Sequence, residues 1–308
     1  MRAAAPGKIV LTGAYAVLYG APALVMAVDR HAIADSDRRN TRRSPELAAA
    51  FGDAAAPAVD TSALYERGVK LGLGSSAAVT VAALATTVTA AELERGRHAL
   101  FQRARAAHAQ AQGGGSGIDI AASTFGGLLE YRLSSCGEEN PASASRGESP
   151  VDGEATSRVW PAGLVCEVFF AGQSAKTSGL LARVRALAAA DPAMFRRVMD
   201  AVITSSTEAV AALGAASDFV AAAARFGRAL GALGAAAAAP IVTPAFGELA
   251  QLAEREHAAF FGAGAGGGDI AVHLGTEPAS RAFTARAREL GLTPVALALD
   301  PLGVRHLA

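Results

Sequence analysis

The chain has few cysteines, few aromatic residues and no excess of charge of either sign. Cys136 and Cys166 are the only cysteines in 308 residues, and two irregularly placed thiols exclude a disulfide scaffold or a cysteine-based zinc site. Lys and Arg together number 28, as do Asp and Glu, so the formal net charge is zero and no nucleic-acid-binding or anionic-membrane surface is predicted. We therefore expect a protein of the reduced cytoplasm.

Long uninterrupted hydrophobic runs are missing as well. The apolar start of the chain is broken by Pro6-Gly7-Lys8, which argues against a secretory signal. The alanine-rich run 229–242 contains Gly231, Gly234 and Pro240 and is too short and too broken to span a bilayer. The sequence predicts no membrane partner.

Lysine is scarce, and this scarcity is informative. Lys8, Lys70 and Lys176 are the only lysines, and the other basic residues are arginine. A site that needs a compact ammonium group does not accept the larger, planar guanidinium group of arginine. The three positions are therefore candidate functional sites, with chance retention on the surface as the alternative.

The order of apolar runs and turn residues predicts an α+β protein. We expect a pair of strands within 3–28 that turns at 19–22, an irregular segment at 35–62, and helices at 75–92, 97–112 and 118–125 before a strand at 127–133. Beyond the polar segment 134–158 we expect strands at 163–171, 269–274 and 294–299, with helices at 178–190, 193–213, 217–233, 244–259 and 278–290. The polar segment suggests two domains, 1–158 and 159–308.

The first motif is a glycine-rich loop that leads into a helix, Gly72-Leu73-Gly74-Ser75-Ser76-Ala77-Ala78. Glycines allow a close approach of the backbone to an anion, and the first N–H groups of the helix point toward it. The loop lacks the Gly-Lys-Ser/Thr ending of a Walker A motif. An ordinary helix capped by serine is the alternative interpretation.

Two further glycine segments each end in an aspartate. In Gly115-Ser116-Gly117-Ile118-Asp119 the carboxylate is at a helix start, where it can accept a proton from a substrate hydroxyl or simply cap the helix. The segment 264–269 runs through four glycines to Asp269 and into an apolar strand, which favours a backbone that passes close to a ligand.

The three segments together, with Pro6-Gly7-Lys8 and the following 13–18 segment, resemble the GHMP small-molecule kinases over nearly the whole chain outside 134–158. The segments 108–113 and 172–177, and Lys70 just before the first loop, are most similar to the phosphomevalonate kinases. The resemblance implies a ribosomal-S5-like N-terminal domain that binds ATP and a ferredoxin-like C-terminal domain, with the site between them.

The resemblance also implies roles for individual residues. Lys8 and Asp119 are the expected catalytic residues, with Asp119 as the base, and ATP with Mg²⁺ are the expected cofactors. The expected nucleotide-binding residues are Gly72, Leu73, Gly74, Ser75, Ser76 and Ala77, with Ser76 also on the metal ion. The expected substrate-binding residues are Arg30, Lys70, Ser116, Gly117, Ser174, Lys176, Thr177, Gly266, Gly267 and Asp269.

The implied reaction is transfer of the γ-phosphoryl group of ATP to phosphomevalonate in isoprenoid synthesis. Phosphorylation of the 5-hydroxyl of mevalonate is the alternative, because the same Lys8 and Asp119 would serve it. A homologue that binds nucleotide or metabolite without catalysis is a second alternative, although a binding protein has no need of a base. The expected assembly is a monomer or a homodimer.

Overall fold

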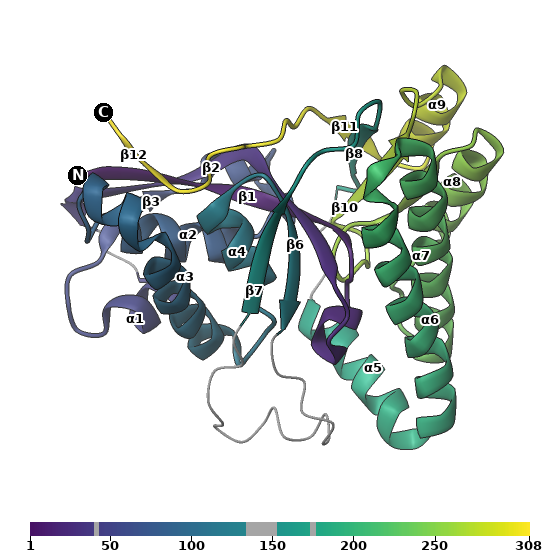
Figure 1. Ribbon diagram of the computed structural model, residues 1–308, viewed down its shortest axis with the longest axis horizontal. Coiled ribbons are helices and arrows are strands. Elements are labelled where there is room, and N and C mark those ends of the chain that lie inside the picture. Colours follow the sequence, from purple (N-terminus) through teal and green to yellow (C-terminus); the bar gives the residue numbers. More distant parts are fainter. Residues whose placement is uncertain (40–42, 134–152, 173–176) are drawn as a thin grey trace.

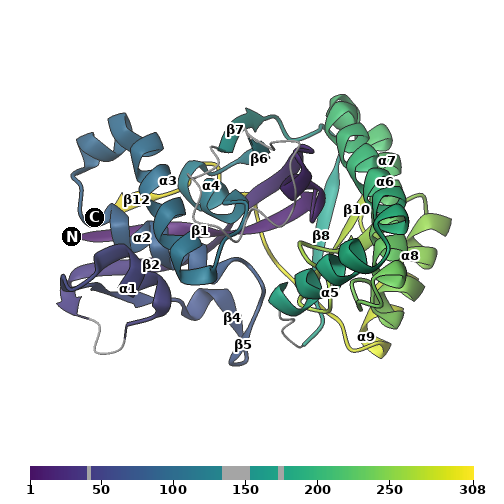
Figure 2. The ribbon, with the colours of Figure 1, turned by 90° about the horizontal axis from the view of Figure 1, so that it is seen from below.

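The computed structural model describes residues 1–39, 43–133, 153–172 and 177–308, which form two large antiparallel sheets with helices on each and a small β4–β5 hairpin (Tyr65–Glu66 and Val69–Lys70) (Figures 1 and 2). The first sheet has the strand order β12-β1-β2-β6-β7, and β3 pairs with β2 beside this row. Its strands are β1 (Arg2–Thr12), β2 (Ala23–Arg39), β3 (Pro57–Asp60), β6 (Leu128–Leu133), β7 (Gly153–Arg158) and β12 (Arg305–Leu307). The helices beside it are α1 (Pro45–Phe51), α2 (Ser75–Ala85), α3 (Ala90–Gln112) and α4 (Ile118–Phe125).

The second sheet has the order β11-β8-β10-β9. It is formed by β8 (Val165–Phe170), β9 (Ala259–Gly262), β10 (Ile270–Gly275) and β11 (Thr293–Val295). Five helices accompany it, α5 (Thr177–Ala190), α6 (Pro192–Ala211), α7 (Ala216–Ala236), α8 (Pro244–Arg255) and α9 (Arg281–Glu289). Edge-to-face contacts among Phe169, Phe260 and Phe283 fill the core beneath α8 and α9. This mixture confirms the α+β expectation.

The β1–β2 hairpin joins the two parts. Its tip is a short 3-10 helix, Ala16–Tyr19, which packs against α6. There Ser206 donates a hydrogen bond of 2.6 Å to the carbonyl of Pro22, and the ring centroids of Tyr19 and Phe195 are 5.6 Å apart. Lys8 lies on β1 of the same hairpin.

Helix α7 is the one helix of the described ranges that is long and apolar enough to cross a membrane. Half of its apolar window is buried inside the protein, with Phe219, Phe226, Leu230 and Leu233 fully enclosed. The core of the folded chain therefore accounts for the apolar side of this helix.

Several predicted elements were wrong in their limits. The helix expected at 75–92 ends at Ala85, because Thr89 caps the next helix through a capping box with Glu92. That next helix runs on from Ala90 to Gln112 through a break in helical geometry at Gly96, where separate helices were expected. Helix α8 ends at Arg255, and part of the stretch assigned to it forms β9.

The segments expected to be irregular also contain regular structure. Within 35–62, β2 continues to Arg39, and α1 and β3 follow. The polar segment 134–158 ends in β7, which pairs with β6 along its whole length; residues 134–152 lie outside the described residues. The last strand, β12, was missed, and it returns to the first sheet beside β1.

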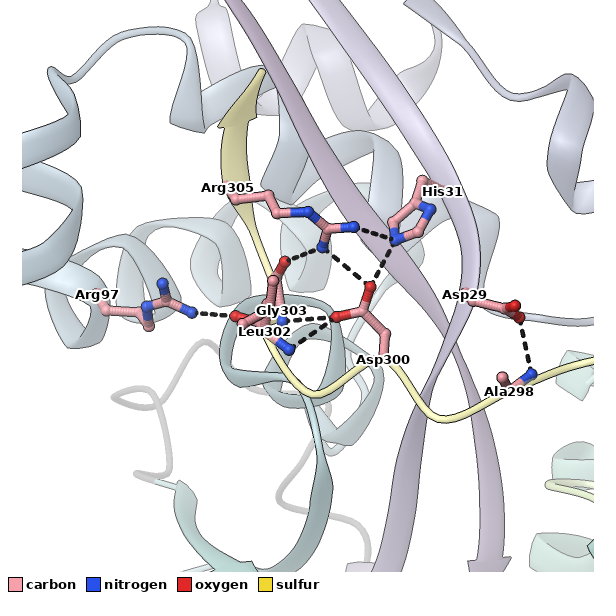
Figure 3. Close-up of polar contacts among 8 residues, drawn as sticks. All are labelled: Asp29, His31, Arg97, Ala298, Asp300, Leu302, Gly303 and Arg305. Atoms are coloured by element: carbon pink, nitrogen blue, oxygen red, sulfur yellow. Dashed lines mark hydrogen bonds and ion pairs between the residues drawn. The ribbon is translucent and has the colours of Figure 1, made fainter. Parts of the chain in front are cut away.

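The return of the C-terminal segment to the first sheet depends on buried Asp300 (Figure 3). One carboxylate oxygen accepts hydrogen bonds from the backbone N–H groups of Leu302 and Gly303, both 2.9 Å long. The other lies 2.7 Å from His31 Nε2 and accepts from Arg305 at 2.9 Å. Burial alone would raise the pKa of Asp300, but these hydrogen bonds hold it well below its usual range.

We expect Asp300→Asn to lower the free energy of unfolding by about 2–4 kcal/mol at pH 7, because charged hydrogen bonds to His31 and Arg305 are lost inside the protein. The pKa of the folded carboxyl is depressed, so its stabilising effect is fully present above the ordinary aspartate pKa of ~3.9 and is lost progressively as the pH falls from there toward the folded pKa. Urea unfolding at pH 7 and at about pH 2 measures both effects. Asp37→Asn, at an exposed ion pair with the N-terminus, is the control and should change little; an equal loss in both variants, or no pH dependence, would contradict the prediction.

Candidate active site

The glycine-rich loop before α2 presents free backbone amides. Gly72 and Gly74 have φ angles of +75° and +72°, in the region that favours glycine. Gly74 is the N-cap of α2, no side chain caps this helix end, and no acidic residue lies in its first turn. The alternative of a helix capped by serine is therefore wrong, since Ser75 and Ser76 are already inside the helix. Uncapped N–H groups at the positive end of a helix suit a phosphate group.

Lys8 and Asp119 face each other beside this loop. Lys8 Nζ lies 3.4 Å from Asp119 Oδ1, and the two side chains are 11% and 29% exposed. A Cβ atom at Gly74 would lie 2.8 Å from Lys8 Cε and 3.5 Å from Asp119 Oδ2. The backbone N–H of Lys8 also donates to the carbonyl of Leu73 at 2.9 Å. The loop, the ammonium group and the carboxylate thus form one compact constellation.

The position of Asp119 follows from the turn before α4. Gly117 is the N-cap of this helix with a φ of +83°, and as a glycine it makes no capping hydrogen bond with a side chain. Ser116 is fixed by its carbonyl, which accepts a 2.5 Å hydrogen bond from Tyr131, and by its hydroxyl, which accepts from the N–H of Ile118. Asp119 is therefore not held as a helix cap, and its carboxylate is directed at Lys8 instead.

The last glycine segment reaches the same place from the far end of the chain. A Cβ atom at Gly72 would lie 2.7 Å from the Cβ of Asp269, so the two loops touch. Tyr15 donates a 2.7 Å hydrogen bond to the carbonyl of Ala265, which links this segment to the β1–β2 hairpin. Glycine is required at position 266 for a different reason, because a Cβ atom there would lie 2.2 Å from the carbonyl oxygen of Ile241. The backbone of Gly266 therefore packs tightly against that of Ile241.

His108 is a residue of the site that the sequence interpretation left without a role. Its Nε2 lies 3.1 Å from the hydroxyl oxygen of Ser76. Burial lowers the pKa of His108, Asp119 and Glu46 oppose this effect, and the positive charges of Lys8 and Lys70 add to it. These mutual influences place His108 among the charged groups of the site. The available signal was the segment 108–113, which carries part of the family resemblance and begins with this histidine.

A cavity of about 270 Å³ adjoins the start of α2. Its lining is contributed by α1, β3, the β4–β5 hairpin (Tyr65–Glu66 and Val69–Lys70) and α2. The polar lining residues are Ser44, Glu46, Thr61, Tyr65, Lys70, Ser75 and Ser76. A larger cavity of about 540 Å³ lies between α5 and α7, but Arg183 is its one charged lining residue and it is remote from the Lys8–Asp119 pair. The smaller cavity has the polar lining and the neighbouring helix end that a nucleotide requires.

Other expected site residues are not joined to this constellation. Ser174 and Lys176 lie outside the described residues. Thr177 is exposed at the start of α5, and Arg30 donates to the carbonyl of Ala63 at 3.4 Å. No contact in the described ranges connects Thr177 or Arg30 to the Lys8–Asp119 pair.

The donor atoms at the site fit a hard divalent cation that arrives with a nucleotide. Mg²⁺ prefers oxygen ligands and keeps several water molecules, so one or two protein oxygens suffice. The hydroxyl of Ser76 and the carboxylate of Asp119 both border the start of α2 and supply such oxygens. In the part of the chain that the structure describes, no cluster of three or more His, Cys, Asp or Glu residues forms a permanent metal site.

Comparison with known proteins points to one family. Residues 50–127 match the family model described as GHMP kinases N terminal domain. Phosphomevalonate kinase of Streptomyces sp. (strain CL190) is 28% identical over 340 residues, and the match covers 91% of this chain and 91% of that protein. Mevalonate kinase of Archaeoglobus fulgidus is 36% identical over 145 residues, which cover 41% of this chain and 51% of that protein.

Solved structures agree on the fold. Phosphomevalonate kinase of Streptococcus pneumoniae, in complex with phosphomevalonate and AMPPNP, superposes with a TM-score of 0.77 at 20% identity over 97% of this chain and 99% of that one. L. major mevalonate kinase, in complex with R-mevalonate, superposes with a TM-score of 0.66 at 17% identity over 98% of this chain and 96% of that one. The expected resemblance is thereby confirmed for the fold and for the N-terminal domain.

Proposed function

We propose that the chain, which has the fold of the GHMP kinases and matches their N-terminal family model over residues 50–127, transfers the γ-phosphoryl group of ATP to phosphomevalonate. The observation that carries this proposal is the Lys8–Asp119 pair, 3.4 Å apart, beside the uncapped start of α2. Phosphoryl transfer requires mainly positioning and charge neutralisation, and these groups supply both.

In this mechanism the start of α2 binds the nucleotide phosphates through its free N–H groups. Asp119 accepts the proton of the acceptor hydroxyl, and it is available for this because no helix-capping bond occupies it. Lys8 stabilises the negative charge that the phosphoryl group carries in the transition state of the transfer. Its ammonium is held in place by the buried stem on β1 and by the close approach of Gly74.

We place Mg²⁺ at the hydroxyl of Ser76, where it would neutralise charge on the nucleotide phosphates and leave Asp119 free to act as the base. His108 orients the Ser76 hydroxyl through its 3.1 Å contact. The cavity of about 270 Å³ beside Ser75 and Ser76 takes the nucleoside part of ATP, with Tyr65 and Leu47 as its apolar contacts.

Phosphomevalonate is preferred as acceptor because the relative that spans 91% of both chains is a phosphomevalonate kinase. Mevalonate is the second candidate, supported by the 36% identity to a mevalonate kinase over the shorter match. A homologue without catalysis has little support, because a binding protein gains nothing from a base paired with a buried lysine. The enzyme is proposed to act in isoprenoid synthesis in the cytoplasm, as a monomer or homodimer. Each chain is proposed to have two domains, 1–158 and 159–308.

The deciding experiment measures ADP formation with ATP and Mg²⁺ in the presence of phosphomevalonate, of mevalonate, and of no acceptor. We expect the specificity constant for phosphomevalonate to exceed that for mevalonate by at least tenfold. The reverse order would establish mevalonate as the acceptor. Turnover with neither compound would reject both assignments.

The phosphate loop is tested by Gly74→Val. The left-handed φ of +72° and the 2.8 Å approach to Lys8 Cε leave no place for a β-branched side chain. We expect the affinity for AMPPNP to fall at least tenfold, about 1.4 kcal/mol, when measured by calorimetry. Gly163→Val is the matched control, since Gly163 has a φ of +77° and no atom within 4 Å of its added Cβ. An unchanged affinity in a folded Gly74→Val protein would remove this loop from the nucleotide site.

A further inference from the structure

Arg105 on α3 is a buried cation that has no polar partner among the described residues. The residue is 7% exposed, and its Nη1 is fully shut off from solvent without a hydrogen-bond acceptor. Across the described ranges, no hydrogen bond or ion pair is formed by its guanidinium. An unpaired buried charge is costly, so buried arginines normally have carboxylates or carbonyl groups around them.

The surroundings of Arg105 increase this cost. A Cβ atom at Gly117 would lie 2.7 Å from Arg105 Nε and 2.8 Å from its Cδ, so the side chain lies directly against the N-cap of α4. This is the positive end of a helix, where the N-cap residue has no side chain and Ser116 accepts from the N–H of Ile118 alone. Tyr131 is close enough that the positive charge opposes the rise of the tyrosine pKa to about 12 caused by burial. Positive charge thus meets the positive end of a helix dipole.

Another arginine of the same helix shows the favourable case. Arg97, about two turns earlier on α3, donates to the carbonyls of Thr124 at 3.2 Å and Leu302 at 2.6 Å. Thr124 is in the last turn of α4, where the helix dipole favours a cation. Helix α3 therefore places one arginine at each end of α4, and the one at the amide end has no acceptor.

We propose that Arg105 and the start of α4 bind an anionic group of the acceptor substrate, a carboxylate or a phosphate monoester. The inference rests on the proposed function, because it concerns the same site. Asp119 lies in the first turn of α4, two residues after Gly117, so an anion held at the start of this helix keeps the acceptor next to the base. The planar guanidinium and the free helix N–H groups together suit a group with two or three oxygens.

The test compares Arg105→Met, Arg105→Lys and the control Arg103→Gln, at an exposed arginine of the same helix. For Arg105→Met we expect the KM of the acceptor to rise at least tenfold and the KM of ATP to change less than threefold. Arg105→Lys keeps the positive charge but loses the planar guanidinium that can donate two parallel hydrogen bonds, so we expect an intermediate rise in the KM of the acceptor. Arg103→Gln should match the wild type in both constants.

Thermal unfolding separates ligand binding from a structural role. Removal of an unpaired buried charge should leave the Tm of the ligand-free Arg105→Met protein unchanged or raised, whereas loss of a structural contact would lower it. The acceptor alone, without nucleotide, should raise the Tm of the wild type and not that of Arg105→Met. A lowered Tm with an unchanged acceptor KM overturns the inference, and so does an equal rise in both KM values, which would assign the anion to the nucleotide.

Failure of the proposed function is recognised separately. If wild-type protein turns over neither phosphomevalonate nor mevalonate, the acceptor assignment is wrong, and the shift of Tm by inorganic phosphate and by acetate then tests Arg105 by itself. A phosphate or acetate shift that Arg105→Met abolishes and Arg103→Gln retains supports the anion site. A shift of equal size in all three proteins overturns it.

Discussion

Replacement of Asp119 by asparagine is expected to lower turnover by roughly 10²–10⁴, the usual contribution of a positioned general base. The amide keeps the size of the carboxylate, but it cannot accept the proton of the acceptor hydroxyl. It also removes the ion pair with Lys8, whose Nζ is 3.4 Å away. Affinity for AMPPNP should stay within a few-fold, because the N–H groups of α2 that bind the phosphates are unchanged. Steady-state kinetics with saturating ATP and calorimetric binding measure the two quantities.

The matched control is Asp218→Asn, at an exposed aspartate in the first turn of α7. Both substitutions remove a negative charge that favours the helix dipole, so both have the same small effect on helix stability. Only Asp119→Asn should affect turnover. Turnover near the wild-type value in a folded Asp119→Asn protein would show that Asp119 is not the base.

Lys8→Arg is expected to reduce turnover by about 10², although the charge is retained. A guanidinium is planar and larger than an ammonium group, and a misplacement near 1 Å at a reacting centre costs on this order. The space for it is limited, because Lys8 is 9% exposed and a Cβ on Gly74 would already lie 2.8 Å from its Cε. The kinetic assay is performed at saturating ATP, with circular dichroism as the measure of folding.

Lys70→Arg supplies the comparison within the chain. Lys70 is half-exposed at the rim of the cavity beside α2, where an arginine has room. We expect turnover within a few-fold of the wild type for this variant. Lys176→Arg, outside the described residues, should be equally mild if that lysine is on the surface. If Lys8→Arg retains more than about half of the activity, the argument from the scarcity of lysine fails and Lys8 has no catalytic role.

The three glycine segments, with the two helices and the strand that follow them, could be predicted from the sequence because they depend on local backbone geometry. Gly74 and Gly117 have left-handed φ angles at the starts of α2 and α4, where the sequence predicted loop-to-helix transitions. The same local rules misplaced the helix break near residue 90, because the Thr89–Glu92 capping box was overlooked. They also missed β7 and β12, whose partners are distant in the sequence.

The tertiary structure alone decided which of these segments meet. Lys8 and Asp119 face each other because β1 and α4 pack together, and Gly72 touches Asp269 because the end of the second sheet reaches the phosphate loop. The pairing of His108 with Ser76 and the isolation of Arg105 beside Gly117 likewise depend on how α3 lies against α2 and α4. Residue types and local turns are properties of neighbours in the chain, so the sequence by itself determined the fold class, the glycine loops and the candidate groups. Burial, charge pairing and the approach of side chains depend on the packing of distant elements, and therefore only the folded chain could decide them.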